Sequence, residues 1–337
     1  MSLAQKIRVV TRDIIEKQMA CGDEKKVLVY DRSSPLASML ADGYMANMPD
    51  AKHIDFDRED PQDIAKTLLS LPAGSTVILV QSLNFRLDAF RIRLQLFNNG
   101  VGCLEHARLK YFPEEQWETY INALEYRGEY YEKLGGKLVE KIEHAKKIEV
   151  ISKNGSILSF GKMEKAKLNH SIFHKQKNRG GAAMCGEVFS EAQDFDSVNG
   201  ELSICCYPAP DLTIVPCAPF TIHVEKSRVT CTDPNCPPDF HKHILEKIAD
   251  AENGEVMMRE AGFGLNPAIS LQHPLADVNA FERMAGFHVS LGKKHNIYRN
   301  KMAKHIPQRY HIDIFTDLKA IRIDDEVVFE DGVYRKY

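Results

Sequence analysis

Strand-like and helix-like segments alternate along residues 1–147, and this alternation is the strongest constraint that the sequence places on the fold. The apolar run 25–31 (KKVLVYD) is typical of a buried strand. The pairs Ser34–Pro35 and Asp60–Pro61 each combine an N-cap residue with the residue preferred at the first helical position. Strands that alternate with helices form parallel sheets covered by helices. We therefore predict an α/β domain with a parallel sheet over residues 1–147.

The pattern changes at residue 148, where short β-like runs separated by Gly, Asn and Pro begin. Asn154-Gly155 and Asp331-Gly332 are typical of tight hairpin turns. One helical segment, 238–251, interrupts the runs. Because 337 residues are enough for two separate cores, we predict a second, mainly β domain over residues 148–337.

Composition and missing motifs argue against several functional classes. The net charge is −3 and no long basic run occurs, so we expect no nucleic-acid partner. No apolar run is long enough for a membrane span or a signal peptide, so we expect a cytoplasmic protein without a membrane partner. The eight cysteines lack C-x-x-C spacing, which favours reduced thiols. The turn after the first strand, DRSSPL, lacks the glycines of a dinucleotide-binding fingerprint.

The segment QRYHIDIF (308–315) carries a histidine and an aspartate two residues apart. In a strand, side chains at i and i+2 point to the same face, so His311 and Asp313 project together. This pattern fits either the polar face of a surface strand or a pair of metal ligands. Deciding between the two requires partner residues from elsewhere in the chain.

Three further residues in glycine-flanked, non-helical segments are candidate partners: Glu187, Glu260 and His288. Together with His311 and Asp313 they make three carboxylates and two imidazoles, a mixture that suits Zn, Mn, Co or Fe. Two divalent cations carry +4, and three carboxylates with one hydroxide carry −4. A site with this content would be neutral, as a buried site requires.

In order and approximate spacing, these residues resemble the M29 metallopeptidases, the aminopeptidase T group. The segment MCGEVFSEAQDFDSVNGELSI places Glu187 at a family glutamate position, and Glu260 begins EAGFGLNP. His288 begins HVSLG, and His311 and Asp313 form the H-x-D pair. Over the N-terminal half the resemblance rests on α/β character only.

The resemblance implies that these five positions bind two divalent metal ions, Zn, Co or Mn. It implies a metal-dependent hydrolase, an aminopeptidase that removes N-terminal residues from peptides through a metal-activated water. Glu187 would be a ligand or the base that accepts the proton of that water. A homodimer and a peptide or small-molecule substrate are further expectations from the resemblance.

Two departures from the family leave other interpretations open. His295 stands where the family carries a tyrosine, seven residues after His288, and we retain it as a catalytic candidate or an unused loop residue. The chain is also shorter than typical family members. Shorter relatives of the fold include dihydroxypyridine dioxygenases with one Fe(II), and His288, His311 and Asp313 match that ligand set. Those relatives carry a histidine near the position of Glu260, so the acidic residue here favours the hydrolase. A metal site kept only as a structural element is the third interpretation.

Overall fold

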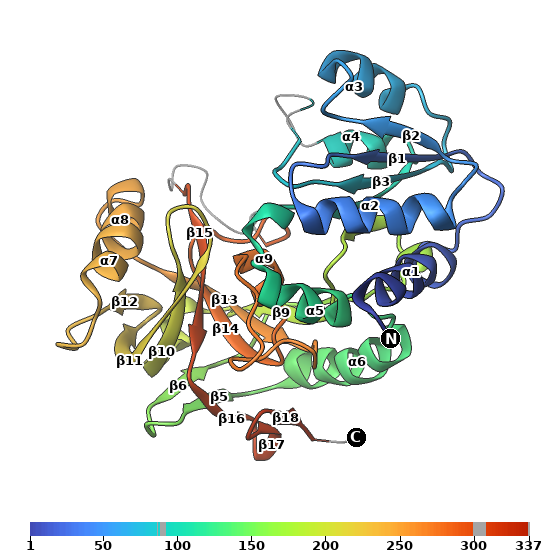
Figure 1. The fold of residues 1–337 in the computed structure, drawn as a ribbon. Coiled ribbons are helices and arrows are strands. Elements are labelled where there is room, and N and C mark those ends of the chain that lie inside the picture. The colour runs from blue at the N-terminus through green and yellow to red at the C-terminus, as the bar shows by residue number, and fades with distance from the viewer. Residues whose placement is uncertain (86, 88–91, 299–307, 336–337) are drawn as a thin grey trace. The chain divides into compact units, whose positions relative to one another are not determined.

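The computed structural model describes residues 1–85, 87, 92–298 and 308–335 (Figure 1). The chain forms two compact units, which are described separately. Unit 1 comprises residues 1–129, 170–185 and 273–276, and unit 2 comprises residues 130–169, 186–272 and 277–337. This grouping interleaves segments of the chain, so it does not test a single boundary between residues 147 and 148, which stays a prediction.

Unit 1 contains the predicted parallel sheet, which has five strands in the order β2-β1-β3-β4-β8. All of its pairings are parallel. The strands are β1 (Lys26–Tyr30), β2 (Lys52–Asp55), β3 (Thr76–Val80), β4 (Gly102–His106) and β8 (Gly180–Ala182). The first four follow one another in sequence, whereas β8 comes from far along the chain. Sequence alternation therefore predicted the sheet but not its last strand.

Helices cover the parallel sheet, with α2 on one face and α3 on the other (Figure 1). The helices of unit 1 are α1 (Leu3–Asp13), continued by a π-helical turn (Ile14–Gln18), α2 (Pro35–Asn47), α3 (Pro61–Leu69), α4 (Ile92–Asn98) and α5 (Glu114–Ala123), with 3-10 turns at Leu109–Tyr111 and Phe173–Lys175. The predicted caps are confirmed, because Ser34 accepts a hydrogen bond from the backbone N–H of Ala37 and Asp60 accepts one from Gln62.

Unit 2 is built on a large antiparallel sheet of thirteen strands. The main path runs β18-β17-β16-β5-β6-β10-β15-β14-β13-β9-β7, while β11 pairs with β10 and β12. The strands are β5 (Ile148–Ser152), β6 (Ile157–Phe160), β7 (Lys167–Asn169), β9 (Glu187–Glu191), β10 (Asn199–Pro208), β11 (Ile214–Glu225), β12 (Arg228–Thr230), β13 (Met258–Gly264), β14 (Gly286–Gly292), β15 (His311–Thr316), β16 (Leu318–Ile323), β17 (Glu326–Glu330) and β18 (Val333–Tyr334).

Both predicted hairpin turns are present in unit 2. Asn154-Gly155 joins β5 to β6, and Gly155 has a φ of +90°. Asp331-Gly332 joins β17 to β18 with positive φ at both residues, as a type I′ turn requires. The remaining helices are α6 (Gly128–His144), α7 (Pro238–Phe240), a π-helical segment (His241–Glu246), α8 (Lys247–Ala251) and α9 (Val278–Phe281), with a 3-10 turn at Phe195–Ser197. The predicted helix 238–251 is thus helical throughout but π-helical at its centre.

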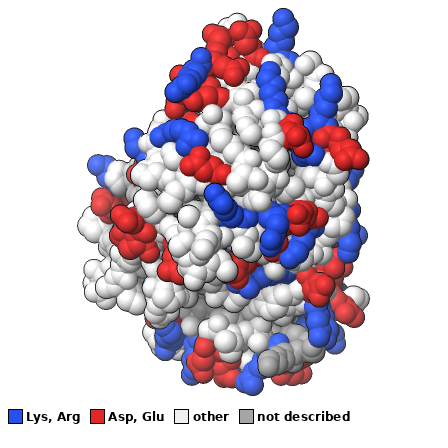
Figure 2. Space-filling view, turned by 45° about the vertical axis from the view of Figure 1, so that its right-hand side comes forward, with Lys and Arg blue, Asp and Glu red and all other residues white. Residues whose placement is uncertain are grey.

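Acidic and basic side chains are interspersed over the face of the molecule shown in Figure 2. Among the described residues, no helix has both the length and the apolar character needed to cross a membrane.

We expect Gly43→Ala in α2 to lower the free energy of unfolding by about 1 kcal/mol. The added methyl carbon would lie 2.7 Å from Cγ2 of Ile7 and 3.1 Å from Oγ1 of Thr11 in α1. Both of those residues are β-branched and stiff, so overpacking outweighs the better helix propensity of alanine. The control is Gly136→Ala in α6, where no heavy atom lies within 4 Å. It should raise stability by about 0.5–1 kcal/mol, and urea unfolding measures both. Shifts of the same sign would contradict the close contact between α1 and α2.

Candidate metal centre

The five predicted ligands lie on four strands that are neighbours in the sheet of unit 2. Glu187 begins β9, Glu260 lies in β13, His288 in β14, and His311 and Asp313 in β15. The order of these strands is β15-β14-β13-β9. Antiparallel pairing therefore brings together residues that are far apart in sequence.

Cross-strand register places all five side chains on the same face of the sheet. Ser290 of β14 is directly opposite both Glu260 and Asp313, and residues opposite each other share a face. His288 and His311 stand two positions before Ser290 and Asp313 and so lie on that face as well. Glu187 is opposite Gly264, four positions after Glu260. Because every second side chain of a strand points to the same face, the ligands of these four strands form one polar surface.

Potential ligand atoms on this face form three groups within which all atoms lie within 4.8 Å of one another. The groups are Glu187, Glu260 and His288; Glu260, His311 and Asp313; and Glu282, His288 and Asp313. Every predicted ligand therefore belongs to at least one group. Glu260 belongs to the first two groups, His288 to the first and third, and Asp313 to the second and third. Glu260 is therefore the residue that joins the two groups made up only of predicted ligands.

The His288 ring occupies space that a side chain at Gly262 would fill. Gly262 is directly opposite His288 in the pairing of β13 and β14. A Cβ atom built on Gly262 would lie 2.1 Å from Nε2 and 2.2 Å from Cε1 of His288. The glycine in the segment EAGFG therefore allows the imidazole to lie across the neighbouring strand, close to the carboxylates.

Two buried ligand atoms have no hydrogen-bond partner among the described residues. They are Oε2 of Glu260 and Nε2 of His288, and both side chains are almost fully buried. Nε2 of His288 lies 3.3 Å from Oε1 of Glu187 and makes no hydrogen bond with it. Buried polar atoms without partners are costly. A cation between them would satisfy both, so this donor set fits a divalent metal ion.

The carboxylates of the cluster differ in how their pKa values are shifted. Burial and the charges of Glu187 and Asp313 raise the pKa of Glu260 well above its ordinary range. For Glu187, burial acts in the same upward direction, but Arg283 and His288 outweigh it and the pKa is lowered. For Asp313, His311 and His288 likewise outweigh burial and lower the pKa. Burial and the charges of Glu187 and Asp313 also raise the pKa of Glu282 well above its ordinary range, although Arg283 opposes the shift. The repulsion between like charges therefore falls on Glu260 and Glu282.

Neighbouring groups orient His311 and Asp313. Nδ1–H of His311 donates a hydrogen bond to the carbonyl oxygen of Lys293 at 3.0 Å. This leaves Nε2, which lies 3.5 Å from Oδ1 of Asp313, as the atom available to a metal. The hydroxyl of Ser290 donates to Oδ1 of Asp313. Such contacts from outside the ligand set are typical of metal sites, where they hold the tautomer and the ring orientation.

Two residues of the cluster were missed by sequence reasoning, Glu282 and Arg283. Arg283 is buried and pairs with Oε2 of Glu187 and, at 2.8 Å, with Oε1 of Glu282. Glu282 follows directly after the short helix α9, so a search of glycine-flanked, non-helical segments passed over it. The only sequence signal was an adjacent acidic and basic pair a few residues before His288.

His295 lies beside the cluster but in none of the three ligand groups. Its ring centroid is 6.4 Å from that of His311. The backbone N–H of Ile297 donates to Nδ1 of His295 at 3.3 Å, so a neutral ring carries its proton on Nε2. Burial, followed by the nearby His311, lowers the pKa of His295. Its own backbone N–H donates to Oε1 of the buried Glu191 at 2.7 Å. A role for His295 in catalysis stays a prediction.

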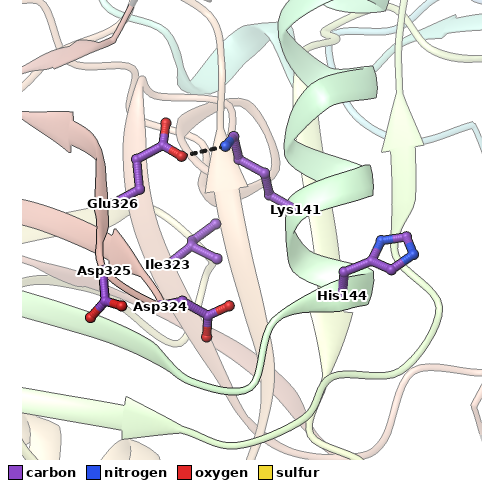
Figure 3. A pocket seen from close by; sticks show the side chains of 6 residues that line it. All are labelled: Lys141, His144, Ile323, Asp324, Asp325 and Glu326. Atoms are coloured by element: carbon purple, nitrogen blue, oxygen red, sulfur yellow. Dashed lines mark hydrogen bonds and ion pairs between the residues drawn. The ribbon is translucent and has the colours of Figure 1, made fainter.

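A surface hollow of about 500 Å³ in unit 2 is lined by none of these residues (Figure 3). It lies between α6 and the β16–β17 turn, and Lys141 and Glu326 form an ion pair of 2.6 Å there. His144 also lines it but belongs to none of the ligand groups. His144 therefore provides a control position for the metal-centre variants.

The chain matches no known family model and no curated protein sequence. Among solved structures, it is similar to 2,5-dihydroxypyridine dioxygenase from Pseudomonas putida KT2440, with a TM-score of 0.65 and 15% identity over 99% of this chain and 98% of that chain. It is also similar to wild-type AmpT from Thermus thermophilus, an aminopeptidase, with a TM-score of 0.64 and 12% identity over 99% and 100%.

Identities this low show the fold alone. The two matches support the α/β architecture with a parallel and a large antiparallel sheet, and both neighbours are enzymes. Membership of the M29 family and the identity of the metal stay predictions.

Gly262→Ala should weaken metal binding while the sheet remains folded. The new methyl group would occupy the place of the His288 imidazole, so the ring must turn away from Glu187 and Glu260. We expect the metal content after dialysis against Co²⁺ or Mn²⁺ to fall, with far-UV circular dichroism unchanged. Gly136→Ala, remote from these residues in sequence and with open space around it, is the control. Unchanged metal content in Gly262→Ala would contradict His288 as a ligand.

The affinity for a divalent metal should rise with pH. Without metal, Glu260 holds its proton above the usual pH range of a glutamate, because its pKa is raised. A metal must displace that proton, so binding is weakest at low pH and strengthens until Glu260 is ionised. Calorimetric titration with Mn²⁺ between about pH 5 and 8 in several buffers measures both affinity and proton release. Glu260→Gln should remove much of the proton release. An affinity independent of pH would refute the protonated state of Glu260.

Proposed function

We propose that the chain is a metal-dependent hydrolase that binds two divalent ions, Zn, Co or Mn, and removes N-terminal residues from peptides. Two observations support the proposal: the ligand cluster of unit 2 and the similarity of the fold to AmpT. The substrate class rests on the resemblance of the ligand segments to the aminopeptidase T group. The alternative is a ring-cleaving dioxygenase with one Fe(II) ion, and the other structural neighbour is a 2,5-dihydroxypyridine dioxygenase.

The observation that carries the proposal is that Glu260 joins the two ligand groups made up only of predicted ligands. One group pairs Glu260 with Glu187 and His288, and the other pairs it with His311 and Asp313. Each group thus offers one imidazole and two carboxylates, with Glu260 in common. A shared carboxylate between two similar ligand sets is the arrangement expected of a two-metal hydrolytic site.

The same geometry favours a hydrolase over an iron oxygenase. The facial triad of such oxygenases needs two histidines and one carboxylate on one metal. In the part of the chain that the structure describes, no ligand group contains two histidines, because His288 and His311 fall in different groups. The two TM-scores are nearly equal and do not discriminate. The donor sets therefore support the hydrolase.

The residues of the cluster have distinct parts in the proposed reaction. Glu187, Glu260, His288, His311 and Asp313 would hold the metal ions, which supply Lewis acidity and lower the pKa of a coordinated water. Glu187 is the candidate proton acceptor, as a ligand or as a general base, because its lowered pKa keeps it ionised. The buried Arg283 keeps one oxygen of Glu187 occupied, so the other oxygen faces His288.

His295 is the candidate donor to the developing oxyanion. Its Nε2 carries the proton of the neutral ring, and its lowered pKa favours that neutral form near pH 7. Glu191 holds the backbone of this residue in place. A homodimer and a cytoplasmic location are further proposals from the family resemblance.

Substitution of the shared ligand should remove more metal than substitution of an unshared one. We expect two metal equivalents per chain in the parent protein, fewer than one in Glu260→Gln, and about one in His311→Ala. Elemental analysis after reconstitution with Co²⁺, Zn²⁺ or Mn²⁺ gives these ratios. His144→Ala, at the separate hollow, should retain both equivalents. Release of amino acids from a panel of aminoacyl-p-nitroanilides and short peptides should follow metal content.

Other outcomes would replace the proposal. One oxygen-sensitive iron per chain, with oxygen-dependent consumption of 2,5-dihydroxypyridine, would establish the dioxygenase alternative. Two metal equivalents that both survive Glu260→Gln would remove Glu260 as the shared ligand. Bound metal without peptidase activity on any member of the panel would overturn the aminopeptidase assignment.

A further inference from the structure

Cys231 and Cys236 form a pair of free thiols at the surface of unit 2, separate in sequence from the metal-centre residues. Neither forms a disulfide in the structure, and both are partly exposed. Both line a hollow of about 520 Å³, which His241, Lys242 and Glu246 also line. The two residues are thus neighbours at the rim of the same hollow. Cys231 follows β12, and Cys236 lies just before α7.

The turn between the two cysteines is held by Asp233. Its Oδ2 accepts the backbone N–H of Thr221 at 2.8 Å, and its carbonyl oxygen accepts the N–H of Cys236 at 2.9 Å. The Sγ–H of Cys231 donates to the carbonyl oxygen of Thr221 at 3.6 Å. Cys231 is therefore bonded directly to Thr221 of β11, and Cys236 is connected to Thr221 through Asp233. The backbone of the turn thus holds both cysteines at the hollow.

A second pair of neighbouring thiols, Cys205 and Cys206, provides a contrast. These residues are adjacent in β10 and also interact with each other, but both are buried. A dissolved reagent cannot reach them without local unfolding. Cys231 and Cys236 instead lie together at a surface hollow wide enough for a small molecule.

We propose that Cys231 and Cys236 form a dithiol site that reacts reversibly with low-molecular-weight disulfides and closes into an intramolecular disulfide. One thiolate attacks a sulfur of the small disulfide, forming a mixed disulfide and expelling one small thiolate. The second cysteine then attacks the protein sulfur of the mixed disulfide and expels the other. The protein loses two electrons and two protons, and the small disulfide becomes two thiols.

The rate of closure should increase with pH. Burial raises the pKa of Cys231, and burial also raises the pKa of Cys236. Because the thiolate is the attacking species, only a small fraction of each residue is reactive near neutrality. At the hollow, Lys242 provides positive charge near the site where a thiolate forms, whereas Asp233 and Glu246 provide negative charge, and Asp233 contributes to the raised pKa of Cys236.

The test treats the full-length, reduced protein with oxidised glutathione at neutral and mildly alkaline pH, followed by intact mass and peptide mapping. The parent protein should lose the mass of two hydrogen atoms and yield one cross-linked peptide pair, Cys231 to Cys236, which dithiothreitol reverses. Cys236→Ser should instead keep one glutathione on Cys231, and Cys231→Ser one on Cys236. Cys217→Ser should behave as the parent protein does.

A stable glutathione adduct on either residue of the parent protein, without the cross-link, would overturn the proposal. A cross-link to any other cysteine, or failure of both residues to react while Cys21 is modified, would also overturn it. A second measurement needs no variant: phenylarsine oxide, which requires two neighbouring thiols, should bind the native parent protein and protect these two cysteines from alkylation. Absence of that protection would exclude the dithiol site even if the serine variants fail to fold.

Discussion

Like charges on one buried face of the large antiparallel sheet are the interaction on which the candidate site depends. Glu187, Glu260 and Asp313 lie close together with almost no exposure to solvent. Their mutual repulsion in a low-dielectric environment is unfavourable without compensating positive charge. Histidine and arginine side chains compensate Glu187 and Asp313, whereas the pKa values of Glu260 and Glu282 are raised. Of these two residues, Glu260 is the one that joins the two groups of predicted ligands.

A two-metal site with one hydroxide has a net charge of zero whether or not Glu282 and Arg283 are counted. Glu282 adds one negative charge to the three predicted carboxylates, and Arg283 adds one positive charge beside it. Four carboxylates and one guanidinium carry −3, and two divalent ions with one hydroxide carry +3. The larger cluster is therefore also neutral when two divalent ions and one hydroxide are bound. Arg283 also limits Glu187 to one free oxygen, a restraint that the five-residue version of the site lacks.

Small residues on the same face make room for the functional side chains. Gly262 leaves space for the His288 ring, and Ser290 stands between Glu260 and Asp313 while donating to Asp313. At Gly262 and Ser290, the strands leave part of their own face open for the ligand side chains. Strand propensity alone would have favoured larger residues there.

The sequence by itself determined the parallel sheet, the helix caps at Ser34 and Asp60, the two hairpin turns and the same-face pair His311 and Asp313, because each depends on neighbouring residues in the chain. It also supplied the residue types at positions 187, 260 and 288, with their place in the site suggested by resemblance alone. Only the tertiary structure decided that β8 completes the parallel sheet and that Glu282 and Arg283 join the cluster. Contacts of this kind are set by strand order and register across the whole sheet. No local pattern encodes them, since a shift of one residue would turn every side chain to the opposite face.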